Sequence, residues 1–127
     1  MDESRRKVQR FTDLEVWRRP HELFLHVLFD LDALPNTRVA TILTDQSVRA
    51  LGSVGANIAE GFNRSKAKYL NCLDISLGEA NETENWLYKL RDAKLLDREK
   101  ANAHFAETIQ IQKMISALHR SISKRSS

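Results

Sequence analysis

The glutamates and histidines of this chain are the first residues to test for chemistry, because helical proteins can build di-iron sites from them. Such a site needs one glutamate from each of two helices and a Glu-x-x-His motif from each of two others. Glutamates recur at Glu79, Glu82 and Glu84, but Glu-x-x-His occurs nowhere in the sequence. His21 and His26 are five residues apart, about 140° around a helix, so they cannot share a ligand face. We therefore expect no metal site and no cofactor.

Nucleophilic catalysis is not indicated either. The segment Gly52-Ser53-Val54-Gly55 lacks the Gly-x-Ser-x-Gly pattern, lies within a helical repeat and has no nearby histidine. No strand precedes Gly52, Gly55 or Gly61, which argues against a phosphate-binding loop. The single cysteine, Cys72, is interpreted as a buried, inert thiol, and all four histidines as surface or boundary residues. We expect a protein that is not an enzyme.

Positive charge is concentrated at the two ends of the chain, whose formal net charge is +3. We predict a disordered basic arm over residues 1–10, a folded body over 11–122, and a disordered basic tail over 123–127. Basic arms are typical of weak, salt-sensitive nucleic-acid binders, and also of termini that merely aid solubility. The candidate phosphate contacts near the C-terminus are Arg120, Lys124 and Arg125.

The stretch from Leu51 to Arg64 repeats its residue types with the spacing of a helix. Small residues form one stripe, in which two helical glycines, Gly52 and Gly55, each cost about 1 kcal/mol relative to alanine. We expect close approach of a neighbouring helix or subunit to compensate, and we expect the helix to stop or kink at Gly61. Ala56 belongs to the same stripe of small residues.

A polar stripe on the same helix carries a further candidate surface. Glu60 and Arg64 have the i, i+4 spacing that favours an ion pair. One interpretation is a recognition patch with a basic corner at Arg64, Lys66 and Lys68. The favoured alternative is structural, with Asn57 and Glu60 satisfying backbone groups near Gly61. Arg49 has no partner in this scheme and could contact phosphate.

Helical periodicity predicts four amphipathic helices joined by short connections, which together make an all-α, antiparallel up-and-down four-helix bundle. Pro20 lies inside the first helix, so regular structure should begin near Arg19, or a bend should follow Trp17. We predict a connection over residues 36–43 and a third helix of about 29 residues. The predicted helix starts are Thr12 or Asp13, then Thr44 or Asp45, then about Ser65, and finally Asp97.

Three segments in order resemble a bacterial family of four-helix-bundle proteins encoded within intervening sequences of 23S ribosomal RNA genes. They are Phe11…Asp13-Leu14-Glu15-Val16-Trp17, Gln46…Arg49-Ala50…Ser53-Val54…Asn57-Ile58-Ala59-Glu60-Gly61-Phe62…Arg64, and Leu77-Gly78-Glu79-Ala80-Asn81-Glu82-Thr83-Glu84. The resemblance implies assembly as a homopentameric ring. A related branch accompanies reverse transcriptases in diversity-generating elements as a nucleic-acid-binding accessory. The motif residues Trp17, Ser53, Asn57, Glu60 and Gly61 are interpreted as structural. Pro20 and Gly55 depart from the family, which usually has a helix former and a proline there.

Together these features predict a cytoplasmic, non-enzymatic oligomer that contacts RNA or another nucleic acid electrostatically. No apolar run reaches the about 20 residues of a membrane span, and we expect no membrane contact. The alternative is a protein–protein scaffold without nucleic-acid affinity. The candidate nucleic-acid-binding residues are Arg49, Arg64, Lys66, Lys68, Arg120, Lys124 and Arg125.

Overall fold

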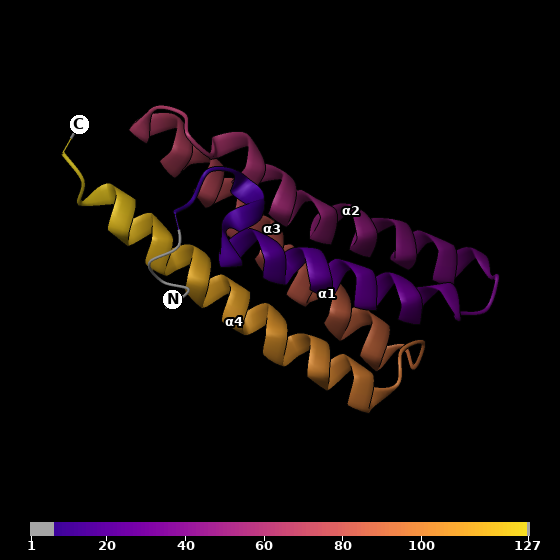
Figure 1. The fold of residues 1–127 in the computed structure, drawn as a ribbon. Helices are drawn as coiled ribbons and strands as arrows, with labels where there is room; N and C mark the ends of the chain where they lie inside the picture. The colour runs from indigo at the N-terminus through magenta and orange to yellow at the C-terminus, as the bar shows by residue number, and fades with distance from the viewer. Residues whose placement is uncertain (1–6, 127) are drawn as a thin grey trace.

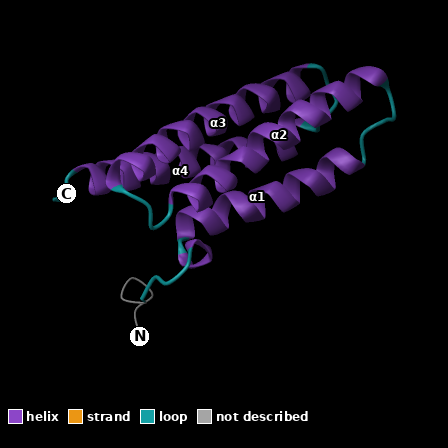
Figure 2. Ribbon diagram, turned by 90° about the horizontal axis from the view of Figure 1, so that it is seen from above, coloured by secondary structure: helices purple, strands orange, loops and turns teal. Residues whose placement is uncertain are grey.

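The computed structural model describes residues 7–126, which form four α-helices preceded by a short 3₁₀ helix and contain no strand. The 3₁₀ helix η2 covers Phe11–Asp13, and the α-helices are α1 (Glu15–Asp32), α2 (Arg38–Gly61), α3 (Lys66–Asp92) and α4 (Arg98–Ser123). The four helices lie side by side along one long axis, and the start of α1 and the end of α4 lie toward the same end of the molecule (Figures 1 and 2). The prediction of an all-α chain with four helices is confirmed.

The starts of α3 and α4 are where their capping residues predict them. Ser65 Oγ accepts a hydrogen bond from the Lys68 N–H at 3.2 Å, and Asp97 Oδ2 accepts from the Glu99 and Lys100 N–H groups. The predicted start of the second helix at Thr44 or Asp45 is wrong. Thr37 caps α2 instead, with its Oγ1 accepting from the Ala40 N–H at 3.2 Å. Residues 38–43 therefore belong to α2 and not to a connection.

The first helix continues through Pro20, so the predicted start near Arg19 is wrong. Pro20 is the sixth residue of α1, beyond the first turn, so its missing N–H removes one backbone hydrogen bond, to the Val16 carbonyl. Its ring is buried, and so contributes to the core. The predicted caps Thr12 and Asp13 are also wrong, because Leu14 occupies the N-cap position. Asp13 Oδ2 instead accepts from the Gln9 and Arg10 N–H groups and closes the preceding 3₁₀ turn.

A continuous apolar core runs between the helices and draws on all four of them. Cys72 is buried there, as predicted, with 1% of its surface exposed. One buried hydrogen bond fixes α3 against α2, since Ser76 Oγ donates to the Val54 carbonyl at 2.8 Å. The most deeply buried large side chains include Val27, Val54, Ile58, Leu73, Leu87, Leu90, Ile111, Ile115 and Ile122.

Two polar pairs tie α1 to α4. Arg19 donates to both carboxylate oxygens of Glu107, at 2.9 and 2.6 Å, and these hydrogen bonds raise the pKa of Arg19. His104 Nε2 lies 2.7 Å from Asp30 Oδ2, and both side chains are almost fully buried. The interpretation of all four histidines as surface or boundary residues is therefore wrong for His104, which is 8% exposed.

The predicted arm and tail lie mostly at or beyond the edges of the described structure. Residues 1–6 and 127 are outside the described residues, so the arm can be followed only from Lys7. Residues 7–9 lie outside regular structure, and Arg10 is the N-cap of η2. At the other end Ser123 still belongs to α4, and Lys124 is its C-cap. No helix within residues 7–126 has the length and apolar character needed to cross a bilayer.

Candidate nucleic-acid interface

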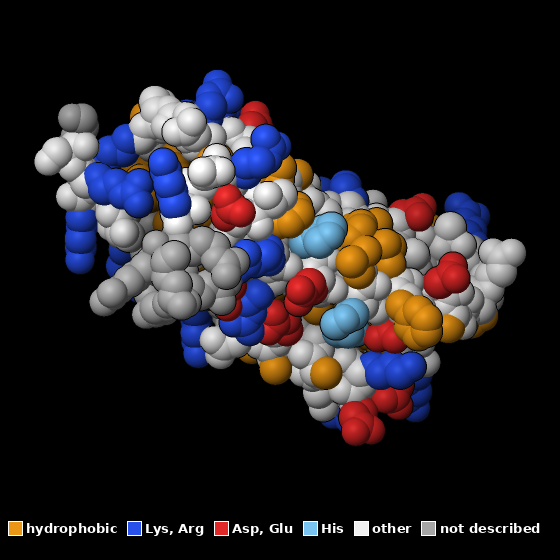
Figure 3. Space-filling model, viewed as in Figure 1, with side chains coloured by type: hydrophobic (Ala, Val, Ile, Leu, Met, Phe, Trp, Pro, Cys, Tyr) orange, Lys and Arg blue, Asp and Glu red, His pale blue; other side chains and the backbone are white. Residues whose placement is uncertain are grey.

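Six of the predicted basic residues come together at one end of the bundle, where α2 turns into α3 and α4 ends. Figure 3 shows Lys and Arg side chains gathered at this end. The contact that joins the two basic segments is a hydrogen bond from Lys66 Nζ to the Arg125 carbonyl at 2.6 Å. We call this surface the basic end; its residues are Arg64, Lys66, Lys68, Arg120, Lys124 and Arg125.

The basic end keeps most of its positive charge. Residues 61–69 and residues 119–126 each contain three Lys or Arg and no Asp or Glu. Lys68 is paired with Glu60, at 3.5 Å. Within residues 7–126, the five other members of the basic end form no ion pair with a carboxylate. An end where four arginine and lysine side chains are exposed, and the half-buried Lys66 also has no carboxylate partner, is suited to binding phosphates.

The backbone at the turn from α2 into α3 holds this surface in shape. Gly61 ends α2, Phe62 is extended, and Asn63 takes a left-handed conformation at φ 58° that asparagine tolerates. A Cβ on Gly61 would lie 2.7 Å from Cys72 Cβ and 3.2 Å from Tyr69 Cδ1. Glycine is therefore required for α2 and α3 to approach this closely, and the predicted helix end at Gly61 is confirmed.

Tyr69 links the buried core to the basic end. No sequence motif indicates that it lies beside the basic end. Burial raises the pKa of its hydroxyl, and the positive charge of Arg125 opposes that rise. The interaction places the Arg125 charge close to the first turn of α3. No signal in the sequence pairs residue 69 with residue 125.

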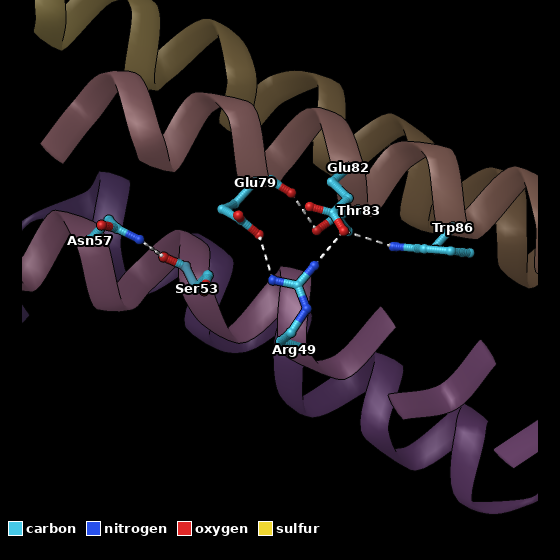
Figure 4. Close-up of polar contacts among 7 residues, drawn as sticks. All are labelled: Arg49, Ser53, Asn57, Glu79, Glu82, Thr83 and Trp86. Atoms are coloured by element: carbon cyan, nitrogen blue, oxygen red, sulfur yellow. Dashed lines mark hydrogen bonds and ion pairs between the residues drawn. The ribbon is translucent and has the colours of Figure 1, made fainter. Parts of the chain in front are cut away.

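Arg49 lies apart from the basic end, and the expectation that it has no partner is wrong. Its guanidinium forms ion pairs with Glu79, at 3.4 Å, and with Glu82 on α3 (Figure 4). Glu82 Oε1 also accepts a hydrogen bond from Trp86 Nε1 at 3.2 Å. The two carboxylates satisfy this arginine within the chain, so it is a weak candidate for phosphate contact.

The predicted Glu60–Arg64 ion pair is also wrong. Because α2 ends at Gly61, Arg64 no longer occupies a helical i+4 position, and Glu60 pairs with Lys68 instead. The favoured interpretation, in which Asn57 and Glu60 satisfy backbone groups near Gly61, is wrong for Glu60 and wrong in location for Asn57, which does bond a backbone group. Its Nδ2 donates to the Ser53 carbonyl at 2.8 Å, one turn earlier and not at the Gly61 bend (Figure 4).

Within residues 7–126, no three His, Cys, Asp or Glu side chains lie close enough together to hold a metal ion. Glu79 and Glu82 are engaged by Arg49. His119 Nε2 lies 3.1 Å from Asp74 Oδ1, and His21 stacks on Trp17. These two glutamates and two histidines thus contact neighbouring side chains of the bundle.

Comparison with known proteins agrees with the sequence motifs. The family model of the 23S rRNA-intervening sequence proteins matches residues 12–117. The chain belongs to the 23S rRNA-intervening sequence protein family. A crystal structure of a protein of unknown function from the S23 ribosomal protein family of Bacteroides thetaiotaomicron superimposes with a TM-score of 0.76 at 30% identity. That match covers 82% of this chain and 97% of the other. No curated protein matches.

Trp17 has a packing role at the start of the bundle. Its ring stacks on His21 with centroids 4.7 Å apart and meets Phe11 edge-on at 5.3 Å. Its Nε1 would lie 3.4 Å from a Cβ on Gly55. The close approach predicted to compensate for Gly55 is therefore made by the indole ring of Trp17 on α1.

Proposed function

We propose that this chain is a non-enzymatic, homo-oligomeric bundle that binds RNA through its basic end as a cytoplasmic accessory protein. The observation that carries the proposal is the Lys66–Arg125 contact, which joins two basic segments 59 residues apart into one surface. Phosphates would meet Arg and Lys side chains there with little reading of base identity. The family's link to 23S ribosomal RNA genes makes RNA the first nucleic acid to test.

We further propose that the bundle is antiparallel and up-and-down. By family resemblance, we propose that the oligomer is a homopentameric ring. The contacts across α2 and α3 support the antiparallel order. Val54 on α2 contacts Ser76 on α3, and Arg49, which comes earlier in α2, contacts Glu82, which comes later in α3. The two helices therefore run in opposite directions at these contacts. The same holds across α1 and α4 for the pairs of Arg19 with Glu107 and Asp30 with His104.

RNA binding can be measured by fluorescence anisotropy with a structured ribosomal fragment and an unrelated RNA across a salt series. If about five phosphates are contacted, the slope of log affinity against log salt should be about −3.5 for single strands. We expect similar affinities for both RNAs. Failure to bind either RNA at low salt would contradict the proposal.

The second candidate function is a protein–protein scaffold without nucleic-acid affinity. It is favoured by one observation, the 79% exposure of Phe29 on α1. Aromatic residues are enriched at protein–protein interfaces relative to the rest of the surface. A protein that binds no RNA but retains its assembly would support this alternative.

A further inference from the structure

A small hollow of about 180 Å³ lies between α3 and α4, which pack side by side (Figures 1 and 2). Leu73 and Ile115, which are fully buried, form its inner wall, and Leu77 adds a third apolar side chain. The side chains of Asp74 and His119 are 67% and 33% exposed, so they lie at its mouth. The α3–α4 hollow is therefore apolar inside and polar at the rim, which suits a small ring system with polar edges.

The α3–α4 hollow is continuous with the basic end, because Arg120 belongs to both. Lys124 follows Arg120 by about one helical turn, or about 6 Å along the axis of α4. Both side chains are exposed. An RNA strand whose phosphates meet these two cations therefore passes over the mouth of the hollow. A base of that strand can enter the hollow while the strand keeps its phosphate contacts.

We propose that the α3–α4 hollow receives one unpaired cytosine of the bound RNA. This inference deepens the proposed function and rests on RNA binding at the basic end. Sequence-specific contacts to RNA are made mainly to unpaired bases, which stack on aromatic side chains and form hydrogen bonds through their edges. A cavity of about 150 Å³ holds benzene, so a volume of about 180 Å³ admits the six-membered ring of a pyrimidine. The two fused rings of a purine need more space than one ring, so the size of the hollow favours a pyrimidine.

Asp74 selects cytosine over uracil. His119 Nε2 lies 3.1 Å from Asp74 Oδ1. A carboxylate has two oxygens with about four lone-pair sites, so Asp74 can hold His119 and still accept a hydrogen bond from a base. The N4 amino group of cytosine donates to such a carboxylate, whereas uracil presents its O4 carbonyl at the same position, and two acceptors repel each other. The imidazole ring of His119, held by Asp74, provides a face on which the base can stack.

The affinities of short single-stranded RNAs test the choice of base. By fluorescence anisotropy at one salt concentration, wild-type protein should bind oligocytidine about tenfold more tightly than oligouridine of the same length. Asp74→Asn should reduce this ratio to about twofold or less, because an amide can present either its oxygen or its NH₂ group to the base. Asp92→Asn is the matched control, the same change at a 65% exposed side chain at the far end of α3, and it should leave the ratio unchanged. The ratio is the readout because removing a negative charge beside the basic end strengthens the binding of every RNA.

A second pair of variants tests the stacking face. His119→Ala should weaken oligocytidine binding about tenfold, and His119→Phe, which keeps an aromatic ring, should retain it. The structured ribosomal fragment and the unrelated RNA can each supply a loop cytosine, so they should still bind alike. Three results would overturn the cytosine site while leaving the basic end intact: equal affinities for oligocytidine and oligouridine, tighter binding of oligouridine or oligoadenosine than of oligocytidine, or a cytosine preference that survives Asp74→Asn. Failure of every RNA to bind would overturn RNA binding itself, and this inference with it.

Discussion

Replacing Arg64, Lys66 and Lys68 together by glutamate is expected to weaken RNA binding on the order of 100-fold at about 0.1 M salt. Each lost phosphate contact should also reduce the steepness of the salt dependence by about 0.7 units on the single-strand scale. The bundle should still fold, because Lys66 and Lys68 lie in the first turn of α3, where negative charge is favoured by the helix dipole. Anisotropy titrations across a salt series measure both effects.

A triple variant at the opposite end controls for net charge. Arg38, Lys94 and Arg98 are exposed residues at the far ends of α2, α3 and α4, and their replacement by glutamate changes the charge by the same amount. We expect this variant to retain RNA affinity within about threefold, because long-range charge effects are screened within about 10 Å at this salt. Equal losses in both variants would mean that overall charge, and not the basic end, governs binding.

Gly61→Ala should destabilise the bundle by about 3 kcal/mol, the upper end of the range for overpacked cores. The added Cβ would lie 2.7 Å from Cys72 Cβ, and that atom cannot move away without shifting the α3 backbone. Chemical denaturation followed by circular dichroism gives the free energy of unfolding. In a Cys72→Gly background the same change should cost less, because the opposing Cβ is absent.

Gly78→Ala is the matched control for this prediction. No atom lies within 4 Å of the position that its Cβ would take, although Gly78 is also in a helix. Alanine should therefore stabilise α3 by about 1 kcal/mol. If Gly61→Ala and Gly78→Ala changed stability alike, close packing of α2 on α3 would not explain the glycine at position 61.

The helices could be predicted from the sequence wherever periodicity and a single good cap coincide. Ser65 and Asp97 each precede an apolar repeat and cap α3 and α4. Before the second helix, Thr37 and Thr44 are equally good caps by residue type. The structure selects Thr37, and Ala40 is then buried at 2% exposure. Thr37 and Thr44 cannot be distinguished as caps by their local chemistry. The packing of the first turn of α2 against the rest of the bundle distinguishes them.

The candidate site was predictable residue by residue but not as a surface. Six of the seven candidate cations do lie together, yet the contact between residues 66 and 125 spans 59 positions. The i, i+4 spacing predicts an ion pair between Glu60 and Arg64 and leaves Arg49 without a partner. Both expectations failed because the actual partners, Lys68 and the glutamates of α3, lie beyond a helix end or on another helix.

Crosslinking wild-type protein to RNA with ultraviolet light, followed by mass spectrometry of the peptides, tests the role of the basic end most directly. We predict crosslinked peptides from the turn between α2 and α3, over residues 62–69, and from the end of α4, over residues 119–126. The same reaction at high salt should lose both sets, because the contacts are electrostatic. Crosslinks confined to the α2–α3 face around Arg49, or none at low salt, would contradict RNA binding at the basic end.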